Sequence, residues 1–96
     1  MNAEWPFDQA PYAEAVTTRG VLEKTAAILV VVHHAEDRSW SFLCGETRAE
    51  EDRRIISMAD AVVLDATLRA VADLPPGWTA VRTSLNAVWR REEDGK

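Results

Sequence analysis

The chain has 96 residues, of which 47% are hydrophobic and 28% are charged, and its formal net charge is −5 at pH 7. This length fits one domain and is too short for two, and the hydrophobic share is that of a folded protein. The acidity argues against nucleic acid and anionic membranes as partners, because a protein needs a basic surface to bind either of them.

Targeting and redox features favour the cytoplasm. The first residues lack the basic start and apolar stretch of a secretion signal, and no uncharged apolar run is long enough to span a bilayer. A single cysteine, Cys44, cannot form an internal disulfide, so the core must hold the fold by itself. We therefore expect a cytoplasmic protein with no membrane association.

The N-terminal segment, residues 1–14, is expected to be an irregular arm. It holds two of the four prolines, which disrupt regular hydrogen-bond ladders. It also carries Trp5, Phe7 and Tyr12, which either clamp the arm onto the core or wait exposed for a partner. The clamp is favoured, because exposed aromatic patches are uncommon on monomers.

The main domain is expected over residues 15–91, followed by a charged C-terminal tail over residues 92–96. Its first elements are a strand-like pair at residues 16–17 and a short helical turn that Thr18 can cap. Gly20 weakens this turn, because glycine lowers helix propensity.

The clearest element is an apolar run at residues 28–34, in which three successive valines favour a strand. Such a run predicts that both faces of the strand are at least partly covered. A polar loop follows, and then a segment in which large apolar residues alternate with serines, the period of a half-buried strand. We predict a β-hairpin with His34 opposite Ser39. This register gathers the following side chains on one buried face: Leu29, Val31, Trp40, Phe42 and Cys44.

The second half begins with a predicted strand at residues 54–56 and continues with two short helices. Ser57 and Asp65 are expected to be the N-caps of these helices, because each precedes apolar residues at helical spacing. Pro75 and Pro76 then forbid further helix.

The residues after the helices predict a type II turn with Gly77 at positive φ. Strands at residues 78–83 and 88–90 complete the pattern. The order of the elements indicates an α+β fold: a small, mostly antiparallel sheet built on a central β-hairpin, with short helices on one side.

Several of these blocks resemble a group of short, uncharacterised bacterial proteins. The shared blocks are His-His-Ala-Glu-Asp at residues 33–37, Trp-Ser-Phe-Leu at residues 40–43 and Asp-Leu-Pro-Pro-Gly-Trp at residues 73–78, and the resemblance covers residues 15–91. The chain departs from the pattern at His34, where the group has an acid. It is more distantly similar to a domain of unknown function linked with the immunity proteins of polymorphic toxin systems. The resemblance implies an immunity-like role and assigns no catalytic residue.

The hairpin tip brings together His33, His34, Glu36 and Asp37, which are candidate binding residues. Imidazoles and carboxylates are metal ligands and acid–base groups. Adjacent strand residues point to opposite faces, so His33 and His34 cannot easily share one ion. The alternative is a polar hairpin end in which one histidine packs beside Trp40, and this reading is favoured.

Catalytic motifs are missing from the sequence. There is no Gly-rich phosphate loop, paired-cysteine motif or nucleophile elbow. In the predicted register Cys44 lies about 13 Å from His33, too far for the imidazole to activate the thiol. We therefore predict no catalytic residue, no cofactor and no metal.

Three further candidate binding residues are Trp78, Arg82 and Trp89, because tryptophan and arginine are common interface anchors. The alternative places Trp78 in the core and the arginines at its rim.

Two functions stay open. The leading one is a non-enzymatic protein-interaction module with a protein partner that acidity predicts to be cationic, and its role would be immunity- or inhibitor-like. The rival is a small ligand-binding protein or hydrolase that uses His33 or His34 with Glu36 or Asp37. The chain is expected to be a monomer or a homodimer formed through an exposed sheet edge.

Overall fold

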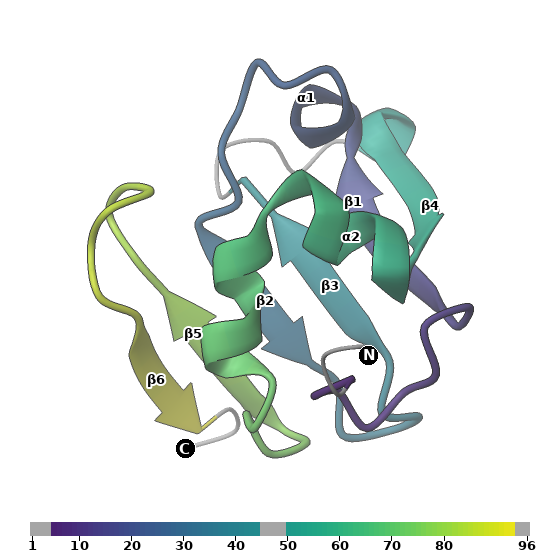
Figure 1. Ribbon diagram of the computed structural model, residues 1–96, viewed down its shortest axis with the longest axis vertical. Coiled ribbons are helices and arrows are strands. Elements are labelled where there is room, and N and C mark those ends of the chain that lie inside the picture. Colours follow the sequence, from purple (N-terminus) through teal and green to yellow (C-terminus); the bar gives the residue numbers. More distant parts are fainter. Residues whose placement is uncertain (1–4, 45–49, 94–96) are drawn as a thin grey trace.

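The computed structural model describes residues 5–44 and 50–93 of the chain (Figure 1). Six strands form one mostly antiparallel sheet in the order β4-β1-β3-β2-β5-β6, and short helices lie in front of it. The strands are β1 (Glu14–Thr18), β2 (Val30–His33), β3 (Trp40–Leu43), β4 (Arg53–Ser57), β5 (Trp78–Val81) and β6 (Arg90–Glu93). The helices are α1 (Arg19–Leu22), η1 (Glu50–Asp52), α2 (Met58–Leu64) and η2 (Ala66–Val71), where η marks 3-10 helices. The predicted α+β class is confirmed.

The β2–β3 hairpin has the predicted register. His33 is paired with Trp40, and the His34 N–H donates to the Ser39 carbonyl at an N···O distance of 2.8 Å. Opposite residues in an antiparallel pair share a face of the sheet. On the face toward the helices, the fully buried side chains of the hairpin include Val31, Trp40 and Phe42. The predicted burial of Trp40 is therefore confirmed.

Two local details, one before β2 and one before α1, differ from the prediction. Leu29 is half-buried and Ile28 enters the core in its place. The strand begins only at Val30, so the alternation of faces does not extend back to Leu29. Thr18 precedes α1 but makes no side-chain cap, because its hydroxyl points to the Cys44 sulfur at 3.8 Å.

Both predicted helix caps in the second half are confirmed. Ser57 Oγ accepts from the Asp60 N–H at 3.0 Å, and Asp65 Oδ1 accepts from the Thr67 N–H at 2.9 Å. Each cap satisfies a backbone donor that the first helical turn leaves without a partner. The two helices then press an apolar stripe onto the sheet: Met58, Ala61, Val62, Leu68 and Val71.

The turn after η2 is also as predicted. Gly77 has a φ of 88°, and the Trp78 N–H donates to the Pro75 carbonyl at 3.1 Å. The Gly77 N–H donates to the His33 carbonyl at 2.7 Å, which ties the turn to β2. Trp78 is half-buried and packs against the core, whereas the sequence analysis considered full burial in the core.

The two ends of the chain contribute more to the fold than the sequence indicates. In the arm, Phe7 is buried and Trp5 packs against the core, whereas Tyr12 is 85% exposed. The prediction that the aromatic residues fix the arm to the core is thus confirmed for two of the three. The last strand is β6, two residues later than expected, because Trp89 lies before it and packs on Arg82. Glu92 and Glu93, expected in the tail, therefore belong to the sheet.

We predict that Trp40→Ala lowers the free energy of unfolding by about 3–5 kcal/mol, because it empties a fully buried aromatic site. Urea denaturation measures this loss. An unchanged denaturation midpoint would contradict the assigned position of Trp40.

We predict that Gly77→Val destabilises the fold by about 1–2 kcal/mol, because a branched side chain is strained at positive φ. Space is not the cause, since an added Cβ would meet the Ala35 Cβ at 3.6 Å, an ordinary contact. Gly77→Asn is the matched control, because asparagine tolerates the left-handed conformation better. Equal melting temperatures for the two variants would refute the strain argument.

Candidate functional site

The seven predicted binding residues do not form one site. His33, His34, Glu36, Asp37 and Trp78 lie at one end of β2, where β2 pairs with β3 and β5. Arg82 and Trp89 lie at the other end, where the Arg82 N–H donates to the Leu29 carbonyl at 3.0 Å. The length of the sheet separates the two groups.

His33 belongs to the core. Its side chain is 2% exposed, and its ring stacks on Trp40 with a centroid distance of 4.0 Å. Nδ1 lies 2.7 Å from the Leu74 carbonyl oxygen, so Nδ1 carries the proton and donates. Nε2 lies 3.2 Å from Asp8 Oδ2, close enough for an ion pair but not aligned as a hydrogen bond. The predicted packing of one histidine beside Trp40 is confirmed for His33.

His34 points to the opposite face of the sheet and lies over Ser41, with Nε2 2.8 Å from Ser41 Oγ. Glu36 and Asp37 are exposed at the hairpin tip. Hydrogen bonds from the Ser39 side chain and backbone lower the pKa of Asp37, and the charge of His34 adds to this shift. In the described part of the chain, no group of three or more His, Cys, Asp or Glu side chains could hold a metal ion.

The His34–Ser41 contact has the geometry of a base beside a nucleophile. Ser41 is 6% exposed, however, and sits on β3 between β1 and β2. The backbone donors around it serve the strand ladders, so they are not available to stabilise an oxyanion. We conclude that His34 covers and satisfies the Ser41 hydroxyl.

Arg82 is a buried brace. Its side chain is 1% exposed, so the alternative that places the arginines at the rim of the core is wrong for Arg82. Nε and Nη2 both donate to the Ile28 carbonyl, at 3.1 and 2.9 Å, and Nη2 also donates to Asp65 Oδ2 at 2.6 Å. Nη1 donates to Thr67 Oγ1 at 3.0 Å, and the Trp89 ring lies 4.1 Å from Cζ. The guanidinium thus links the start of β2, the α2–η2 junction and the β5–β6 connection.

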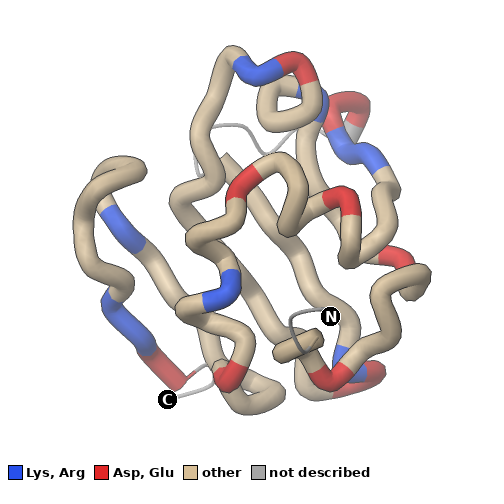
Figure 2. Tube along the Cα trace, viewed as in Figure 1, with Lys and Arg blue, Asp and Glu red and all other residues tan. Residues whose placement is uncertain are grey.

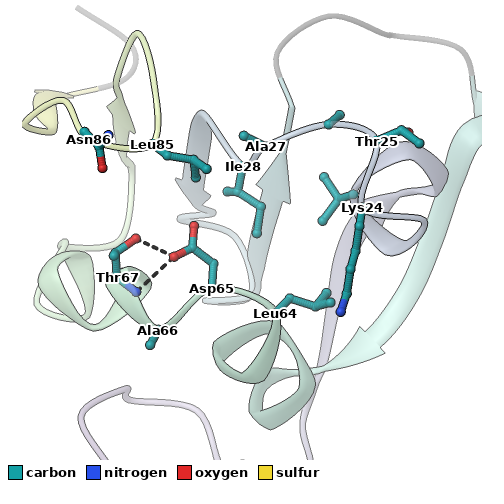
Figure 3. A pocket seen from close by; sticks show the side chains of 12 residues that line it. Lys24, Thr25, Ala27, Ile28, Leu64, Asp65, Ala66, Thr67, Leu85 and Asn86 are labelled. Atoms are coloured by element: carbon teal, nitrogen blue, oxygen red, sulfur yellow. Dashed lines mark hydrogen bonds between the residues drawn. The ribbon is translucent and has the colours of Figure 1, made fainter.

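A cleft of about 590 Å³ opens beside this brace (Figure 3). It is lined by residues from three segments that are far apart in the sequence: 21–28, 64–67 and 85–86. No local sequence pattern could therefore have predicted it. Asp65 is on its wall, but its carboxylate already accepts from Thr67 and Arg82. Lys24, which has a φ of 65°, contributes a cation.

The face of the sheet away from α2 and η2 carries six apolar side chains together with polar ones such as His34, Ser41 and Thr79, and among the described residues no helix covers it (Figure 1). In each of the strands β1 to β5, every second side chain points to this face, as the strand registers show. We call this the open face and define it by six residues: Val16, Val30, Val32, Leu43, Ile55 and Val81. Ile55 is 54% exposed, and the other five are half-buried because neighbouring strands flank them.

Charges surround the open face and are absent from its centre. β2, β3 and β5 contain no Lys, Arg, Asp or Glu, whereas the outer strands and loops do (Figure 2). Glu14 and Arg53 flank the face at β1 and β4, and Arg90 and Glu92 form a 3.2 Å ion pair at β6. A centre without charges and a charged rim are the usual composition of a protein–protein interface.

Comparison with known proteins adds no assignment, because no protein-family model, curated protein or solved structure matches this chain. In the described residues, no helix is long and apolar enough to cross a membrane.

We predict that Arg82→Met lowers the free energy of unfolding by about 3–5 kcal/mol, because it leaves the Asp65 carboxylate without its buried cation. Adding Asp65→Asn should restore part of this loss, because asparagine carries no charge and still caps η2. Urea denaturation of both variants measures the difference. A double variant no more stable than Arg82→Met would show that charge compensation is not the reason for the loss.

Proposed function

We propose that this protein is a non-enzymatic protein-interaction module that docks a protein partner on the open face of its sheet. One observation carries the proposal. The apolar run of β2 calls for cover on both faces, and the described helices supply it on one face only. Exposed apolar patches of this kind on small domains commonly mark interaction sites.

The proposed partner is cationic. With a formal net charge of −5, the protein attracts basic proteins at long range and repels a second copy of itself. The charged rim then orients the partner, while the six apolar residues provide the buried centre of the contact.

The role that we propose is immunity-like or inhibitor-like, exerted in the cytoplasm. The support for it is the resemblance of residues 15–91 to short bacterial proteins, together with the acidity and the absence of recognised catalytic motifs in the sequence. An inhibitor needs a complementary surface and no chemistry of its own.

A second candidate function is small-ligand binding, and the cleft beside Arg82 is the observation that favours it. Its volume of about 590 Å³ falls in the range of ligand pockets, and its lining combines apolar side chains with the polar residues Lys24, Thr25, Asp65, Thr67 and Asn86. It does not contain the histidines that the sequence analysis named for this alternative. Hydrolysis has less support, because Ser41 is buried beneath His34.

We predict that Ile55→Glu weakens binding of the partner by about tenfold or more, because it places an unpaired carboxylate in an apolar interface. The partner is first isolated by affinity capture from native lysate and identified. The dissociation constant is then measured with the purified partner by calorimetry. Because Ile55 is 54% exposed, the melting temperature should change little.

The matched control is Val63→Glu. Val63 is an equally branched residue, 82% exposed on α2, on the helix side of the molecule. It adds the same charge and should leave the dissociation constant unchanged. Equal weakening by both variants would indicate a charge effect alone, and no weakening by Ile55→Glu would exclude the open face as the docking surface.

A further inference from the structure

The N-terminal arm fills an aromatic site at the end of the sheet nearest the hairpin tip. Phe7 is 6% exposed and meets the Trp40 ring edge-on, with centroids 5.0 Å apart and planes at 90°. Phe42 and Trp5 flank Phe7, and their ring centroids lie 6.4 and 5.5 Å from that of Phe7. Edge-to-face packing at these distances is specific for an aromatic ring.

The next residue supplies a carboxylate to two buried polar atoms. Asp8 Oδ1 accepts from Trp40 Nε1 at 3.0 Å, and Asp8 Oδ2 lies 3.2 Å from His33 Nε2. His33 cannot turn away, because Nδ1 donates to the Leu74 carbonyl and the ring is stacked on Trp40. Trp40 Nε1 can only donate, and Nε2 of His33 has no hydrogen-bond partner, so a carboxylate is well suited to this position.

Residues 5–10 of the arm are held by little else, whereas the residues after them are anchored to α2, because the Ala59 and Met58 N–H groups donate to the Pro11 and Ala13 carbonyls at 2.9 and 2.8 Å. Trp5 Nε1 donates to the carbonyl of Gln9, four residues away within the arm, and Gln9 Nε2 donates to the Arg38 carbonyl at the exposed hairpin tip. The arm joins no strand before β1 begins at Glu14. The attachment of residues 5–10 therefore depends chiefly on Phe7 and Asp8, which are adjacent in sequence.

We propose that this site recognises a peptide segment in which an aromatic residue precedes an acidic one, and that Phe7-Asp8 occupies it as an intramolecular ligand. The arm then acts as a strap that a competing segment of a partner must displace. A strap closed 99% of the time lowers the apparent affinity for such a segment by about 100-fold. This site faces the helix layer, so it is separate from the open face, and neither proposal depends on the other.

The experiment empties the site in the full-length chain with Phe7→Ala/Asp8→Ala. The probe is the acetylated peptide Trp-Pro-Phe-Asp-Gln-Ala, whose sequence is that of residues 5–10. Binding is followed by NMR at the Trp40 indole N–H and the His33 ring. We expect the variant to bind the peptide at least about tenfold more tightly than the unmodified chain does, because the intramolecular competitor is gone.

Three controls make the result specific. Peptides with Phe→Ala or Asp→Asn should bind the emptied site at least about tenfold more weakly than the parent peptide. Tyr12→Ala alters an exposed aromatic residue of the same arm and should leave peptide binding at the level of the unmodified chain. If Phe7→Ala/Asp8→Ala does not fold, the milder Phe7→Leu/Asp8→Asn takes its place.

The proposal is overturned if a folded variant binds the peptide no better than the unmodified chain, or if either altered peptide binds as well as the parent. It is also overturned if the peptide shifts resonances of Val32 and Ile55 on the open face instead of those of Trp40 and His33.

Discussion

The register of the β2–β3 hairpin is the constraint on which the rest of this structure depends. Pairing His33 with Trp40 sends Val31, Trp40 and Phe42 toward the helices and sends Val30 and Val32 the other way. A slip by one residue would exchange these sets, because side chains alternate with a period of two. The same register separates the two histidines, so His33 enters the core and His34 covers Ser41 on the open face.

A single layer of short helices then determines what remains exposed. α2 and η2 cover one face of a six-stranded sheet, and the arm closes the end of that face with Phe7. At the far end of the sheet, the loops also have a polar support. Arg82 supplies it through its ion pair with Asp65 and two hydrogen bonds to the Ile28 carbonyl. The open face receives no equivalent cover from the described residues, and this asymmetry underlies the proposed function.

Local patterns predicted most of the fold. The alternation around Trp40, the caps at Ser57 and Asp65, and the turn at Gly77 each depend on neighbours within a few residues, and all of them appear in the structure. The errors concern residues whose environment is determined by segments far away in the sequence. The two readings of Arg82 were an interface anchor and an arginine at the rim of the core, yet the side chain is buried because its partners Ile28 and Asp65 come from other parts of the chain.

The candidate site was less predictable than the fold, for the same reason. Residue type alone drew attention to His33, His34, Glu36 and Asp37, but a hairpin tip divides such residues between two faces and solvent. The open face carries no chemical motif, and its sequence signal was the uninterrupted apolar run at residues 28–32, which requires cover on both faces, whereas the described helices provide it on one. The Asp8–His33 contact joins residues that no spacing rule connects.

The central claim is that the open face is accessible in the isolated protein and becomes covered when the partner binds. The most direct measurement is NMR of methyl groups in the presence of a soluble paramagnetic probe, first without and then with the captured partner. The account predicts strong relaxation at Ile55 and Val32 and little at Val31 in the isolated protein, followed by protection of Ile55 and Val32 in the complex. Protection of Ile55 and Val32 in the isolated monomer, or their continued exposure in the complex, would contradict it.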